Sequence, residues 1–233
     1  MSVKDGKDYL YLIWKSEKSR KQYIIGELTK NGQYEFQYGE EVKDAIADGF
    51  KPLLCFPKLD KVYKDNKRFF EFLQVVYLIV KGKNIHAILE KYGLEEYDDY
   101  TLLKRSGARL PIDNLEFIDP IFNLDANVTR IFYMAGVRHY LKCEGKDCRQ
   151  AVKVTRGDEV FLRKEPDNTY DQNAVQFLDN YGNVLGYMPR YYSKGVSELL
   201  VNGEKITCHI YHVDKSKNCN ECIKVIMKIK KSS

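Results

Sequence analysis

The sequence contains no apolar run long enough to span a membrane. Its longest, residues 72–80, holds nine residues and includes a glutamine, whereas a membrane-spanning helix needs about 20. The N-terminal segment lacks a long apolar stretch ending in small residues, so we expect no secretory signal. Six cysteines in 233 residues are too sparse for a disulfide scaffold. These absences predict a protein of the reducing cytoplasm.

Motifs of the common enzyme classes are also missing. The sequence has no His-Glu-x-x-His metal motif, no Walker phosphate loop and no Gly-x-Ser-x-Gly elbow. Asp98 and Asp99 form a carboxylate pair, but adjacent residues on a helix diverge. We therefore expect this pair to cap a helix, and we expect the protein not to be an enzyme.

The composition is that of a soluble globular protein, with 44% hydrophobic and 30% charged residues. Residues 1–122 carry 20 Lys+Arg and 20 Asp+Glu, whereas residues 123–233 carry 18 and 13. The whole net charge of +5 therefore belongs to the C-terminal half. Excess positive charge favours a polyanionic partner, although a merely solvated basic surface is the alternative.

Hydrophobic periodicity predicts an α+β protein of two domains, residues 1–122 and 127–233, with turn-forming residues at 119–127 between them. For the first domain it predicts a turn at Asn31-Gly32, a buried helix or strand at 69–80, strands at 9–14, 22–25 and 33–38, extended pieces at 53–56 and 110–117, and helices at 41–48, 85–92 and 98–105. The second domain is mostly strand, with one helix capped by Ser193, which suggests a small barrel. Its expected strands are 128–136, 159–164, 174–178, 184–188, 205–213 and 222–229.

Three segments of the second half combine cations, aromatic rings and a carboxylate. They are Gly136-Val-Arg-His-Tyr140, Leu162-Arg-Lys-Glu-Pro-Asp-Asn-Thr-Tyr-Asp-Gln-Asn-Ala-Val175 and Gly186-Tyr-Met-Pro-Arg190. Such groups can grip a phosphate, stack on a base and accept a hydrogen bond from a sugar hydroxyl. The alternative is a structural turn, in which Asp171 and Asn173 cap the backbone and the aromatic residues fill the core.

These three segments, at their separations, resemble the HIRAN domain, over roughly residues 127–230. The resemblance implies an OB-like β-barrel that binds single-stranded DNA at its 3′-hydroxyl end. By motif position, it places Arg138 and His139 at the end-binding pocket and Tyr170 on the terminal base. Asp171 would accept a hydrogen bond from the 3′-hydroxyl, and Tyr187 and Arg190 would line the phosphate track. His139 stands where eukaryotic members have tyrosine, and Tyr187 where they have histidine.

The first half resembles the N-terminal subdomain of HipA-type toxin kinases. The similar segments are Gly26-Glu-Leu28, Tyr34-Glu-Phe-Gln-Tyr38, Pro52-Leu-Leu-Cys-Phe-Pro57 and Tyr97-Asp-Asp-Tyr-Thr-Leu-Leu-Lys-Arg-Ser-Gly-Ala-Arg-Leu-Pro111. Only the non-catalytic lobe of that family is suggested, because no kinase motif follows. The resemblance implies that residues 1–122 mediate protein contacts.

Four cysteines are spaced as two pairs, Cys143-x₄-Cys148 and Cys219-x₂-Cys222. If their loops met, four thiolates could hold a structural zinc. The alternative, which we favour, is four ordinary thiols and no cofactor.

The sequence therefore predicts a cytoplasmic protein of bacterial or phage type that recognises DNA without catalysis. In this hypothesis a HIRAN-like barrel binds single-stranded DNA at 3′ ends and is coupled to a protein-interaction domain. A phage- or prophage-type module that binds and inhibits or tethers a nucleoprotein complex is the alternative. The charge of the second half is compatible with both.

Overall fold

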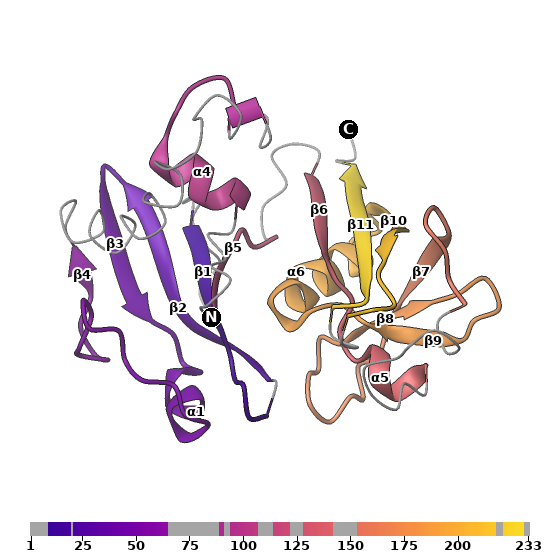
Figure 1. Ribbon diagram of the computed structural model, residues 1–233, viewed down its shortest axis with the longest axis horizontal. Helices are drawn as coiled ribbons and strands as arrows, with labels where there is room; N and C mark the ends of the chain where they lie inside the picture. Colours follow the sequence, from indigo (N-terminus) through magenta and orange to yellow (C-terminus); the bar gives the residue numbers. More distant parts are fainter. Residues whose placement is uncertain are drawn as a thin grey trace. The chain divides into compact units, whose positions relative to one another are not determined.

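The computed structural model describes residues 9–19, 21–64, 89–90, 94–106, 114–121, 128–141, 153–217 and 221–230. It divides into two compact units, Met1–Pro120 and Ile121–Ser233. Strands and short helices make up both units, so the chain is α+β as predicted (Figure 1). No helix among these residues is long and apolar enough to cross a membrane.

The N-terminal unit is built on a five-stranded antiparallel sheet of order β4-β3-β2-β1-β5. Its strands are β1 (Tyr9–Lys15), β2 (Gln22–Asn31), β3 (Gln33–Tyr38), β4 (Tyr63–Lys64) and β5 (Leu115–Ile118), and its described helices include α1 (Val42–Ala47) and α4 (Asp99–Ser106). Asn31 pairs with Gln33 across the predicted turn, where Gly32 adopts a φ of 76° that favours glycine. Buried residues of the sheet, including Leu10, Ile25 and Phe36, form its core.

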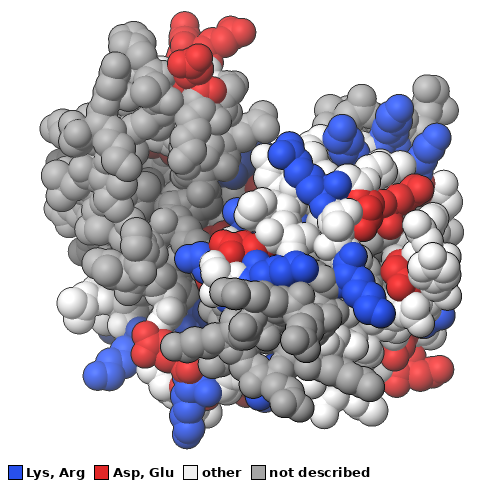
Figure 2. All heavy atoms as spheres, turned by 45° about the vertical axis from the view of Figure 1, so that its right-hand side comes forward, with Lys and Arg blue, Asp and Glu red and all other residues white. Residues whose placement is uncertain are grey.

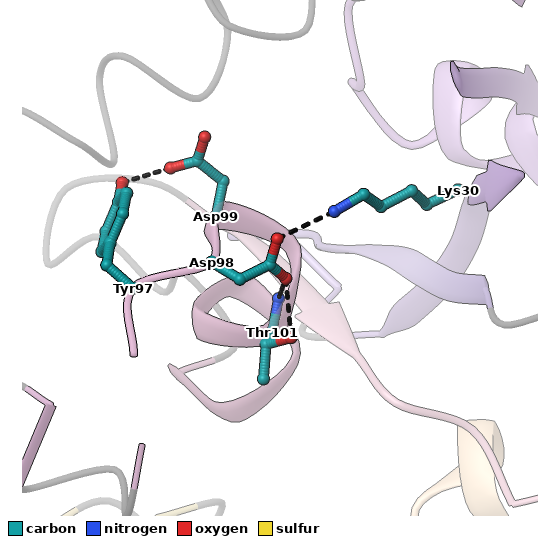
Figure 3. A network of polar contacts seen from close by, with 5 residues as sticks. All are labelled: Lys30, Tyr97, Asp98, Asp99 and Thr101. Carbon is teal, nitrogen blue, oxygen red and sulfur yellow. Dashed lines mark hydrogen bonds and ion pairs between the residues drawn. The ribbon is translucent and has the colours of Figure 1, made fainter. Parts of the chain in front are cut away.

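Helix α4 begins at a cap that the sequence predicted. The Asp98 carboxylate accepts hydrogen bonds from the Thr101 backbone N–H at 2.8 Å and from the Thr101 hydroxyl at 2.6 Å. Its other oxygen pairs with Lys30 Nζ at 2.9 Å (Figure 3). Lys30 belongs to β2, so this carboxylate both caps the helix and ties it to the sheet. Asp99 instead accepts a hydrogen bond from the Tyr97 hydroxyl.

The C-terminal unit contains one curled six-stranded antiparallel sheet of order β6-β11-β10-β7-β8-β9. Its strands are β6 (Val128–Tyr133), β7 (Glu159–Lys164), β8 (Val175–Leu178), β9 (Val184–Tyr187), β10 (Lys205–Val213) and β11 (Ile223–Lys230). Ala135, just after β6, exchanges both backbone hydrogen bonds with Tyr187 of β9, at 2.9 and 2.8 Å. This bridge joins the two edges of the sheet at one point, which gives the unit a half-closed, barrel-like form.

The concave side of the curled sheet holds the core. Inward residues such as Phe132, Phe177 and Val225 are buried there, and helix α6 (Arg190–Val201) contributes Tyr192, whose ring meets Phe132 edge-on at 5.2 Å. Glycine is required where the edges meet, because a Cβ at Gly186 would lie 2.5 Å from the Ala135 carbonyl oxygen.

Two local predictions about the C-terminal unit were wrong. Strand β6 ends at Tyr133, and the following residues form a one-turn helix, α5 (Val137–Tyr140), after Gly136 in a left-handed conformation. Helix α6 begins at Arg190, so Ser193 lies inside it and does not cap it. Pro189, whose φ of −55° suits the start of a helix, explains the earlier beginning.

Some elements predicted for the N-terminal unit differ in the structure or lie outside the described residues. Residues 54–55, within the extended piece expected at 53–56, form a turn. Strand β5 includes residues 115–117 of the extended piece expected at 110–117, and residues 110–113 lie outside the described residues. The elements expected at 69–80 and 85–92 lie outside the described residues, apart from two helical residues at 89–90.

Candidate nucleic-acid interface

The three sequence segments singled out above occupy neighbouring elements of the C-terminal unit. The first forms α5, the second forms the end of β7, the connecting loop and the start of β8, and the third runs from β9 into α6. Hydrogen bonds made by side chains, to one another and to backbone N–H groups, link all of these elements. We refer to the linked residues as the motif network: Tyr140, Arg163, Glu165, Asn168, Asp171, Gln176, Tyr187 and Ser193.

The Tyr187 hydroxyl is the centre of the motif network. It lies 2.8 Å from the Tyr140 hydroxyl, 2.7 Å from Glu165 Oε2 and 3.2 Å from Gln176 Nε2. Arg163 donates to Gln176 Oε1 through two nitrogens, at 2.9 and 2.8 Å, which turns the amide NH₂ of Gln176 toward Tyr187. Tyr187 therefore donates its single proton to Glu165 and accepts from Gln176 and Tyr140.

Glu165 and Asn168 carry the network into the loop between β7 and β8. Asn168 Nδ2 donates to Glu165 Oε2 at 2.7 Å, and Asn168 Oδ1 accepts from the backbone N–H groups of Tyr170 and Asp171 at 2.9 and 3.1 Å. The hydrogen bonds from Asn168 and then Tyr187 lower the pKa of Glu165, so this carboxylate is ionised at neutral pH. Burial, followed by the contact with Tyr140, raises the pKa of Tyr187, which keeps its hydroxyl neutral.

Asp171 ties the same loop to α6. Its Oδ1 accepts the Asn173 backbone N–H at 2.9 Å, and its Oδ2 lies 2.7 Å from the Ser193 hydroxyl. That hydroxyl also lies 2.9 Å from the carbonyl oxygen of Arg190, but its one proton goes preferentially to the charged acceptor. The carboxylate is half-buried, and an ionised carboxylate has about four acceptor positions. Asp171 is thus a cap that keeps room for further donors.

Four of the six predicted site residues present exposed side chains. Tyr170 is 91% exposed, although its backbone is fixed by Asn168, and Arg138, His139 and Arg190 are exposed on α5 and at the start of α6. Tyr187 and Asp171 are half-buried and hold the network together. The arrangement can offer an aromatic ring for stacking, guanidinium groups for phosphates and a carboxylate for a hydroxyl.

The C-terminal unit resembles known proteins. The HIRAN domain family model matches residues 128–230. Residues 128–230 are therefore similar to the HIRAN domain. The crystal structure of the HIRAN domain of human HLTF is similar at 18% identity, covering 46% of this chain and 81% of that one, with a TM-score of 0.34. A crystal structure of a Lactobacillus plantarum protein is similar at 19% identity over 46% and 98%, also with a TM-score of 0.34. No curated protein matches the chain.

Sequence reasoning missed the residues that assemble the site in the C-terminal unit. Tyr140, Glu165 and Asn168 stood within the singled-out segments, but no role was given to them. Ser193 was predicted to cap a helix, and no local sequence pattern indicated the partners of Gln176. The family match begins at residue 128, so the likeness of residues 1–122 to the HipA N-terminal subdomain stays a prediction.

The predicted zinc site falls largely outside the described residues. Cys143, Cys148 and Cys219 are not described, and Cys222 is buried next to β11. Within the described ranges, no three His, Cys, Asp or Glu side chains gather as metal ligands. Zinc binding by these four cysteines therefore remains untested by the structure.

Proposed function

We propose that the HIRAN domain binds single-stranded DNA at the motif network, prefers a free 3′-hydroxyl end and acts by recognition without catalysis. The observation that carries this proposal is the placement of Tyr170. Its ring is 91% exposed on a loop whose backbone N–H groups are fixed by Asn168. A rigidly presented, solvent-exposed aromatic ring loses little conformational freedom when a base stacks on it.

Each predicted residue has a distinct part in this proposal. Tyr170 stacks on the terminal base, which is worth about 1–3 kcal/mol and tolerates any base. Asp171 accepts a hydrogen bond from the 3′-hydroxyl at an unused acceptor position and repels a terminal phosphate. Arg138 and Arg190 neutralise phosphates.

His139 and Tyr187 contribute differently. His139 is exposed on α5 and offers a second ring near the pocket. The Tyr187 hydroxyl is used within the protein, so we assign Tyr187 a positioning role between α5 and the β7–β8 loop, with its ring beside the phosphate track.

Fluorescence anisotropy with short labelled strands tests the proposal. Wild type should bind a strand ending in 3′-hydroxyl more tightly than the same strand ending in 3′-phosphate. Asp171→Asn should reduce that preference, because the amide no longer repels phosphate, whereas Tyr170→Ala should weaken binding of both strands. Tyr181→Ala is the matched control, since Tyr181 is 90% exposed in the β8–β9 turn. Equal binding of both ends by wild type would reject end recognition.

Salt dependence tests the phosphate contacts separately. If lysines and arginines meet phosphates, log affinity should fall with log salt by about 0.7 per contact. Arg138→Ala should weaken binding of both ends alike and flatten the slope by about one contact. An affinity that stays constant between about 50 and 200 mM salt would exclude a phosphate track.

For residues 1–122 we propose a protein-interaction role, in line with the HipA-like resemblance. In the described part of this unit, Leu54 is 99% exposed at a turn between α1 and β4. A large apolar side chain in that position is available to a partner. A pull-down compared with and without nuclease treatment separates direct protein contacts from contacts through DNA. Partners that all disappear after nuclease treatment would contradict this role.

A further inference from the structure

The convex side of the curled sheet carries a second basic surface, separate from the motif network. Cross-strand partners point to the same face of a sheet, so the pairing of β6, β11 and β10 fixes which residues share it. Val225, Met227 and Cys208 are buried on the concave side. The alternate positions therefore form the convex side, which we call the β6–β11–β10 face: Thr129, Ile131, Tyr133, Lys224, Ile226, Lys228, Lys230, Lys205, Thr207 and His209.

The charged side chains of these three strands are all basic, and Glu159 of β7 lies opposite His209 at the edge of the face. Strands β6, β10 and β11 contain no aspartate or glutamate. Lys205 and Lys230 lie directly opposite each other in the register, an arrangement that destabilises a sheet because like charges repel. No described carboxylate forms an ion pair with these two residues, Lys224 or Lys228. Figure 2 shows both basic and acidic side chains on the visible face of the molecule.

Aromatic rings accompany these cations. Lys224 Nζ lies 4.8 Å from the centre of the ring of Tyr133, its partner on β6. At the irregularity of β10, outside the positions that define the face, the Arg156 guanidinium lies 5.9 Å from the centre of the Tyr211 ring, which is 40% exposed. Ile131, two residues before Tyr133 on β6, is 48% exposed. Cations together with rings on a sheet face suit a flexible polyanion that carries stackable groups, because the cations neutralise phosphates while bases contact the rings.

The β6–β11–β10 face adjoins the motif network. Tyr133 and Ala135 are two residues apart and point to the same side, since Met134 between them is buried. Ala135 pairs with Tyr187, the centre of the network, across the bridge that joins the sheet edges. From Ala135 back to Thr129, six residues of extended chain cover about 20 Å.

We infer that the β6–β11–β10 face binds the part of a single-stranded nucleic acid that continues inward from the end held at the motif network. This inference rests on the proposed DNA-binding function and extends it, because it gives the internal nucleotides a path. Lys224 and Lys228 contact successive phosphates, and Tyr133 contacts a base. Affinity should therefore increase with strand length beyond the few nucleotides that the motif network holds.

Binding of strands of about 4 and about 12 nucleotides by the full chain tests the inference. Wild type should bind the longer strand more tightly and with a steeper salt slope. Lys224→Gln/Lys228→Gln should remove most of that gain and flatten the slope for the longer strand by about 1.4, which is 0.7 for each of two contacts. Binding of the shorter strand should change little.

Two further variants make the test specific. Lys43→Gln/Lys51→Gln removes the same charge from exposed positions of the N-terminal unit and should leave the length dependence intact. Tyr133→Leu keeps an apolar side chain without the ring, and should weaken binding of the longer strand without flattening its slope. Circular dichroism of each variant confirms that it is folded.

The outcomes separate this inference from the function on which it rests. If wild type binds neither strand, both are wrong. If wild type binds both strands equally, or the two double variants behave alike, the motif site stands and the face is not a nucleic-acid path. If Lys224→Gln/Lys228→Gln weakens both strands by the same factor, the face is no separate extension and the inference also falls.

Discussion

Replacing Tyr187 by phenylalanine removes one oxygen atom from the centre of the motif network. The ring, which meets the Tyr140 ring at a centroid distance of 5.5 Å, can stay in place. The change deletes the hydrogen bond donated to Glu165 and the two accepted from Tyr140 and Gln176. Helix α5 and the β7–β8 loop thereby lose their shared contact.

The magnitude follows from the partners that are lost. A hydrogen bond to a charged group contributes about 1.5–3 kcal/mol and a neutral one about 1 kcal/mol. Water can replace some of these bonds, because Tyr187 is only half-buried. We therefore expect the free energy of unfolding of the C-terminal unit to fall by about 2 kcal/mol, which lowers the melting temperature by about 8 °C for a unit of this size.

Hydrogen–deuterium exchange measures this loss of stability in the C-terminal unit. The single tryptophan, Trp14, lies in β1 and packs on Phe50 at 5.5 Å, so its fluorescence reports the N-terminal unit instead. Peptides covering α5 and β9 should exchange faster in Tyr187→Phe, and single-strand affinity should fall because Arg138 is no longer held in place. Tyr181→Phe loses the same atom from an exposed ring and is the control. If the two variants exchange at the same rate, the motif network does not stabilise the site.

Two more predictions concern stability. Burial alone would raise the pKa of Asp98, but hydrogen bonds from Thr101 and Lys30 outweigh it and lower the pKa from 3.8 to about 2. The stability that this lowered pKa gives the folded state is full above pH 3.8 and is lost as the pH falls through about 2. Because Asp98 is nearly half exposed, it amounts to about 1 kcal/mol after screening. Asp98→Asn should therefore lower the urea midpoint of Trp14 fluorescence at pH 7 but not near pH 2, and an equal loss at both would contradict the assignment. Gly186→Ala should lower the free energy of unfolding by about 1–3 kcal/mol, because the added methyl group overpacks the bridge at Ala135. Gly182 has open space around it but a φ of 81°, so Gly182→Ala should lower the free energy of unfolding by about 1 kcal/mol. Thermal melting measures both losses. A smaller loss for Gly186→Ala than for Gly182→Ala would show that the bridge can adjust.

Local features of the fold could be predicted from the sequence. Alternation with period two located β3, β7 and β10 within a residue or less of their observed bounds, because one face of each strand meets a core and the other meets solvent. Asn31-Gly32 predicted a turn because glycine adopts positive φ without strain. A cap at Asp98 or Asp99 was predicted, because a carboxylate there can reach backbone N–H groups three residues away, and Asp98 is the one that does so. The three motif segments were likewise found, since each is contiguous.

How those segments come together depended on the tertiary structure. The Tyr187 hydroxyl contacts residues 47, 22 and 11 positions away in the chain, and no local pattern selects such partners. The helix at Val137–Tyr140 was missed because a single turn is too short for a helical period, and its position depends on contacts with β9.

The sequence alone showed that the C-terminal half is basic, but not where its lysines gather. Lys205, Lys228 and Lys230 share one face because β10 and β11 pair in a particular register. A shift of one residue would turn every side chain of a strand to the other face. Residue types therefore determined which chemistry the protein can offer, whereas strand pairing and closure of the curled sheet decided which of those groups act together.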